Sequence, residues 1–88
     1  MKDEISILIT TIKEKRESLR GKIGLGFVDT EYKQAEQTAV ESLQSFHKGD
    51  IAKANNELLL AKYYAKDADR QVKKWRELLK KLKEDSLL

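Results

Sequence analysis

Residues 51–82 read IAKANNELLLAKYYAKDADRQVKKWRELLKKL, and this stretch decides the fold. On a heptad that starts with Ile51 at position a, every a and d position through Leu82 is apolar. A seam of this length without glycine or proline predicts one long amphipathic helix over about residues 51–84. The seam consists of ten residues: Ile51, Ala54, Leu58, Ala61, Ala65, Ala68, Val72, Trp75, Leu79 and Leu82.

The sequence also allows an arrangement with four helices. The long helix would then break at Lys66-Asp67, with Asp67 capping the fourth helix. The alanines in the first half of the seam allow a neighbouring helix to approach closely. The bulky residues from Val72 onward need a wider partner surface, which the first helix or a second subunit would supply.

The residues before the long helix predict two shorter helices. Apolar residues recur with helical spacing over about residues 2–20, and Gly21 is a natural end for that helix. A second helix is expected over about residues 30–47. Three glycines lie in the segment 21–28 between them, so we expect a glycine-rich crossover there.

The turn between the second and third helices has a sequence signature. Gly49 is a helix-ending residue, and Asp50 beside it can cap the helix that follows. This pair predicts an antiparallel helical hairpin. The expected fold class is therefore all-α: a three-helix bundle with a long amphipathic C-terminal helix, in a single domain of residues 1–88.

Composition narrows the classes of function. The 88 residues include no cysteine, which excludes disulfides, thiolate metal ligands and cysteine nucleophiles. His47 is the one histidine, and no nucleophile–base–orienter set is visible, so we expect no metal, cofactor, small-molecule substrate or enzymatic activity. No apolar run approaches the roughly 18 residues of a membrane span, so a cytoplasmic location without a membrane partner is expected.

Positive charge gathers near the C-terminus. Residues 70–83 hold seven basic residues and a single acidic one, Glu77. They lie off the apolar seam. Such a face is either solvated, or it contacts an anionic membrane, an acidic groove of another protein, or nucleic-acid phosphates without reading sequence. The candidate contacts are Arg70, Lys73, Lys74, Arg76, Lys80, Lys81 and Lys83.

Some apolar residues of the long helix also lie off the seam. Leu59, Leu60 and Tyr63 either form the centre of the bundle, between the two shorter helices, or an exposed patch that meets a second chain. Leu78 adds a smaller apolar end to the helix, with Leu87 and Leu88. The candidate protein interface consists of Leu59, Leu60, Tyr63 and Leu78.

The hypothesis that follows is a small helical module for protein–protein interaction or self-assembly, without catalytic activity of its own. The alternative is a small basic protein that binds nucleic acid independently of sequence through the basic face of residues 70–83.

Overall fold

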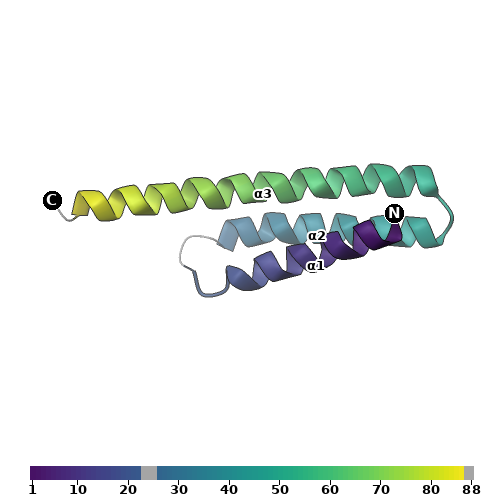
Figure 1. Ribbon diagram of the computed structural model, residues 1–88, viewed down its shortest axis with the longest axis horizontal. Coiled ribbons are helices and arrows are strands. Elements are labelled where there is room, and N and C mark those ends of the chain that lie inside the picture. Colours follow the sequence, from purple (N-terminus) through teal and green to yellow (C-terminus); the bar gives the residue numbers. More distant parts are fainter. Residues whose placement is uncertain (23–25, 87–88) are drawn as a thin grey trace.

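A computed structural model describes residues 1–22 and 26–86, without the side chains of Phe27, Asp85 and Ser86. The described part contains three helices and no strand: α1 (Lys2–Ser18), α2 (Gly26–His47) and α3 (Ile51–Ser86). Figure 1 shows α1 and α2 lying along the first part of α3, in a molecule 60 Å long and under 20 Å across. The all-α fold class is confirmed, and α3 runs unbroken through Lys66-Asp67.

The ends of the first two helices differ from the expected bounds. α1 ends at Ser18, and Gly21 follows with a φ of +73°, a left-handed conformation that glycine adopts readily. α2 begins at Gly26, four residues before the expected start at residue 30. Asp29 lies inside the first turn, where a carboxylate interacts favourably with the helix dipole. The middle of the expected crossover, residues 23–25, falls outside the described residues.

The hairpin turn between α2 and α3 follows the sequence signature. Gly49 has a φ of +84°, and its amide donates to the carbonyl oxygen of Phe46 at 3.0 Å. The Asp50 side chain accepts a hydrogen bond of 3.1 Å from the amide of Lys53, as a helix cap does. The turn therefore fixes α2 and α3 as antiparallel neighbours.

Small residues form the interface between α2 and α3. Ala35 and Ala39 of α2 are fully buried, as are Ala54 and Ala61 of α3. The Ser42 hydroxyl, also buried, donates to the carbonyl oxygen of Ala54 at 2.6 Å. Side chains this small let two helices approach closely, and the serine bond ties one helix to the backbone of the other.

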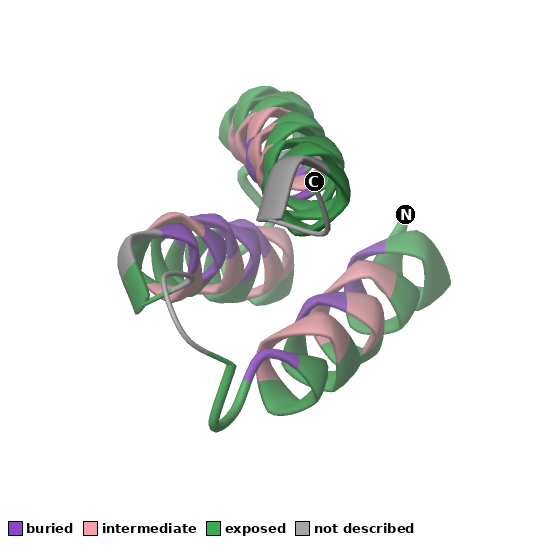
Figure 2. Ribbon diagram, turned by 90° about the vertical axis from the view of Figure 1, so that its left-hand side faces the viewer, coloured by how far each residue is buried: buried purple, intermediate pink, exposed green. Residues whose placement is uncertain are grey.

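Larger apolar side chains fill the other end of the bundle, where α1 ends and α2 begins. They form a cluster with Ala35, Ala65 and Ala68, on which Leu8, Tyr64 and Trp75 also pack. Figure 2 shows the buried positions of the three helices turned inward, towards one another. The larger members of the cluster are Ile12, Leu19, Val28, Tyr32 and Val72.

α3 is longer than the surface that covers it. α2 has 22 residues, so an antiparallel partner beginning at Ile51 is covered as far as Val72, which is the last buried residue described on α3. Three of the ten seam residues are therefore exposed. Ile51 is exposed at the hairpin end, and Leu79 and Leu82 are exposed beyond Val72.

The close packing of α2 on α3 predicts the effect of a larger side chain at their interface. Replacing Ala61 with leucine should lower the free energy of unfolding by about 1–3 kcal/mol, because there is no space for three more carbon atoms between α2 and α3. Ala52→Leu is the matched control, since Ala52 is exposed on the same helix. Urea unfolding of both variants checks this, and equal stabilities would contradict close packing at the seam.

Candidate functional site

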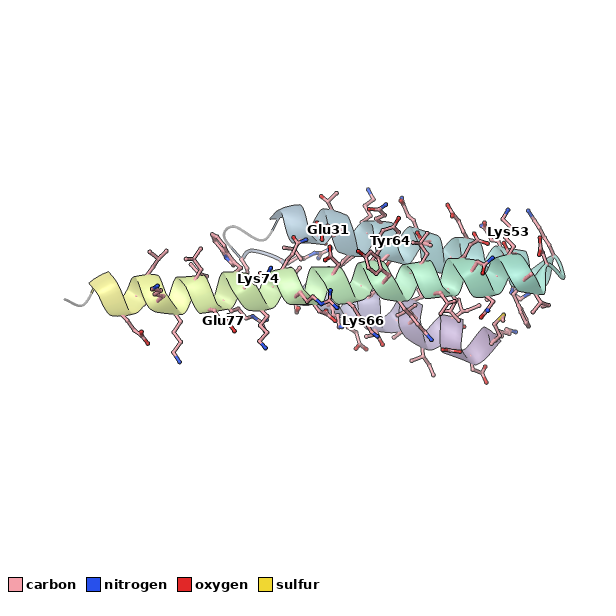
Figure 3. All side chains as sticks on the ribbon, turned by 90° about the horizontal axis from the view of Figure 1, so that it is seen from above. Glu31, Lys53, Tyr64, Lys66, Lys74 and Glu77 are labelled. Atoms are coloured by element: carbon pink, nitrogen blue, oxygen red, sulfur yellow. The ribbon has the colours of Figure 1, made fainter. Side chains whose placement is uncertain are left out.

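The α3 overhang, residues 73–84, is the part of α3 that lies beyond the last buried residue and for which the structure describes side chains. Figure 3 shows it extending past both α1 and α2. Trp75, Leu78, Leu79 and Leu82 are spaced i, i+3, i+4 and i+7, so they form one stripe along the helix. Trp75 is partly buried against the core, whereas Leu78 is 46% exposed and Leu82 53% exposed. The stripe thus starts on the core and continues into solvent.

The candidate nucleic-acid contacts lie on and just before the overhang, and all seven are exposed. Within residues 1–22 and 26–84, no carboxylate oxygen comes within 4.0 Å of the side-chain nitrogens of six of them. These six are Arg70, Lys73, Lys74, Arg76, Lys80 and Lys81.

Charge divides the molecule into two parts. Residues 1–72 carry twelve basic and twelve acidic groups, so their net charge is zero. The overhang carries six basic groups against Glu77 and Glu84, and Asp85 follows directly, so residues 73–86 have a net charge of +3. A basic tip therefore projects from a neutral body.

The candidate interface residues divide into two surfaces. Leu59 and Tyr63, 58% and 61% exposed, are one turn apart on the outer side of α3, and Leu60 is exposed beside them. The interpretation that these three form the bundle centre is wrong, because α1 and α2 pack on the other side of the helix. Leu78 is eighteen residues beyond Leu60, or about 27 Å along the axis, so it belongs to the overhang instead.

The exposed Tyr63 side chain contacts its neighbour on the helix, Tyr64. Its ring lies edge-on to that of Tyr64, with centroids 6.0 Å apart. Tyr64 in turn is partly buried against the core cluster. Tyr63 therefore stands on the surface with its ring placed by a residue that the core holds.

A polar cluster that the sequence did not reveal ties the three helices together. The ammonium group of Lys15 on α1 pairs with the Asp69 carboxylate of α3 at 2.8 Å. Asp69 also accepts a hydrogen bond from the hydroxyl of Tyr32 on α2. Burial, together with this bond to a carboxylate, raises the pKa of Tyr32 above its ordinary value. The cluster lies one turn before Lys73, so it fixes the point from which the overhang projects.

Three further ion pairs attach α1. Arg16 pairs with Asp29 at 2.9 Å and with Glu36 at 3.3 Å, both on α2. At the other end of α1, Glu4 pairs with Lys62 of α3, and this contact lowers the pKa of the exposed Glu4 carboxyl. α1 is therefore held at both ends by charge, as well as by its buried isoleucines.

Two open grooves lie at the end where α1 meets α2. The larger is lined by basic residues, including Lys13 and Arg20, and by the Arg16 ion pairs. The smaller runs from the Tyr32–Asp69 cluster to Arg76. Their central charged groups are used to hold helices together. No set of three or more side chains that could hold a metal ion is present in the described part.

Comparison with known proteins identifies no relative: no protein-family model matches the chain, and neither does any curated protein or solved structure. None of the described helices has a window long and apolar enough to cross a membrane. The argument for function therefore depends on the surfaces described above.

The Tyr32–Asp69 contact predicts a dependence of stability on alkaline pH. In the unfolded chain Tyr32 ionises near pH 10, whereas in the folded chain it keeps its proton. The folded state then binds more protons, so the free energy of unfolding falls above about pH 10, by at most about 1.4 kcal/mol per pH unit from this group.

The matched variant is Tyr32→Phe. It should lose about 1 kcal/mol of stability at pH 7, because the hydrogen bond to Asp69 is absent. Its stability should also fall less steeply than that of the parent between pH 10 and pH 12. Urea unfolding of both chains across this range measures the difference. Parallel pH profiles would contradict a protonated, buried Tyr32.

Proposed function

We propose that this chain is a small helical module that binds another protein, or a second copy of itself, through surfaces that α3 leaves uncovered. One observation carries the proposal: the apolar seam of α3 continues past Val72, where its coverage by α2 ends. Helical faces of this kind are a common means of recognition between proteins.

The distribution of exposed apolar side chains supports the same function. Ten large apolar residues are exposed in the described part, and seven of them lie on α3. Large apolar side chains that gather on one element of a small protein are typical of an interaction surface. The seven are Ile51, Leu59, Leu60, Tyr63, Leu78, Leu79 and Leu82.

A second candidate function is sequence-independent binding of nucleic acid by the seven basic residues of 70–83. The charge of the overhang favours it, since the rest of the chain has no net charge up to residue 72. Such binding would be weak and would fall steeply with salt, because it depends on the release of counterions from phosphates.

Site-specific photo-crosslinking in the native cell tests the protein-binding function. A photo-reactive amino acid is placed at Tyr63 or Leu78, one residue from each exposed surface of α3, and at Gln37 of α2 as the control. We expect a discrete covalent adduct of a second protein, or of another copy of this chain, from Tyr63 or Leu78 and none from Gln37. No adduct from either position on α3, or equal adducts from all three, would contradict the proposal.

A further inference from the structure

The geometry of the overhang points to the kind of partner it takes: we infer that an acidic amphipathic helix of another protein packs on it. This inference rests on the protein-binding function proposed above and names the surface and the chemistry of its occupant. Three observations carry it: the length of helix left uncovered, the shape of its apolar stripe and the position of charge around that stripe.

The stripe has the width of a helix-binding face. Leu78, Leu79 and Leu82 present three exposed apolar side chains within five residues, and Trp75 joins them to the core. Apolar residues at i, i+3, i+4 and i+7 are the pattern with which one helix packs on another. A partner helix placed here would continue the seam that α2 covers as far as Val72.

Charge flanks the stripe on both sides. At about 100° per residue, Arg76 and Lys83 fall on one edge of the stripe, and Lys74 and Lys81 fall on the other. Of the three acidic residues, Glu77 and Glu84 fall on the side of α3 opposite the stripe, whereas the position of Asp85 falls on the edge that carries Lys74 and Lys81. A helix that packs on the stripe therefore meets positive charge along both of its own flanks, and acidic residues there would complement it.

A second copy of this chain fits the same surface poorly. Two overhangs packed together would bring net charges of +3 and +3 into contact, which opposes association. A stripe of four apolar side chains is also small beside the roughly 20–30 residues that each partner contributes to a standard stable interface. A partner of opposite charge adds electrostatic attraction to the small apolar contact that the stripe offers.

Binding of nucleic acid would not bury the apolar stripe. Phosphate contacts account for the lysines and arginines, but they would leave Leu78, Leu79 and Leu82 in water. An acidic amphipathic helix satisfies the apolar stripe and the basic flanks together.

The test uses two synthetic peptides of three heptads, both with leucine at positions a and d. One has glutamate at every e and g position, and the other has lysine there. Binding of each to the full-length chain is measured by fluorescence anisotropy at low salt and at high salt. We expect the glutamate peptide to bind at least about tenfold more tightly than the lysine peptide, and its affinity to fall as salt rises.

Two double variants locate the binding surface. Leu79→Gln with Leu82→Gln removes apolar side chains of the overhang and should weaken binding of the glutamate peptide by at least about tenfold. Leu59→Gln with Tyr63→Gln removes the other exposed pair on α3 and should leave the affinity unchanged. All four residues are exposed, so circular dichroism should show the same helicity and the same unfolding transition for both variants.

The outcomes separate this inference from the proposed function. Equal binding of the two peptides would overturn the inference, because charge would then play no part. Loss of binding in the Leu59/Tyr63 variant alone would also overturn it, but would leave a protein-binding function on the other surface. If neither peptide binds and a DNA duplex is retained at low salt and released at high salt, the overhang is a nucleic-acid contact and the inference is wrong. Absence of binding to peptides and duplex alike would overturn it too, while the crosslinking experiment still decides the proposed function.

Discussion

α2 has 22 residues and α3 has 36, so an antiparallel hairpin of the two leaves fourteen residues of α3 without a partner on α2. At 1.5 Å per residue, the two helices are about 33 Å and 54 Å long. α1 does not make up the difference, because its 17 residues lie antiparallel to α2 within the same span. The bundle is therefore complete around residues 54–72 of α3 and absent around most of the overhang.

Two kinds of interaction hold the covered part together. Alanines and Ser42 bring α2 and α3 into close contact, while larger side chains fill the end where α1 joins them. Charged groups then fix α1 at both ends, through Glu4 with Lys62 and through Lys15 with Asp69. The Lys15–Asp69–Tyr32 cluster lies next to the end of the core, so α3 leaves the bundle from a fixed point. A helix that begins inside a rigid bundle presents its stripe in a defined orientation, which lowers the cost of ordering it when a partner binds.

The sequence predicts the elements of this fold well. Heptad spacing predicts α3, and Gly49-Asp50 predicts the hairpin turn, because both are local patterns with a local cause. The periodicity of α3 shows which face is apolar, but it does not show how far a neighbouring helix covers that face. The exposure of Leu79 and Leu82 follows from the length of α2, whose coverage of α3 ends at Val72. The start of α2 at Gly26, in a segment whose glycines indicate a crossover, extends that coverage by about one turn.

The candidate sites were predicted less completely. The exposure of Leu59 and Tyr63 was one of two alternatives, because periodicity does not tell whether an apolar residue off the seam meets another helix or water. Leu78 lies on a separate surface, as its distance along the helix from Leu60 indicates. Lys15 and Asp69 are 54 residues apart in the chain, so no local pattern pairs them. Such contacts follow from the packing of helices that are already formed.

Residue-by-residue hydrogen exchange of the full-length chain, followed by NMR, tests most directly whether α3 leaves its bundle after Val72. The account predicts that the amides of residues 54–72 exchange only through global unfolding, whereas those of residues 78–84 exchange through local opening and far faster. Equal protection on both sides of Val72, at a concentration where light scattering shows a monomer, would mean that the chain itself covers the overhang. That result would contradict the account.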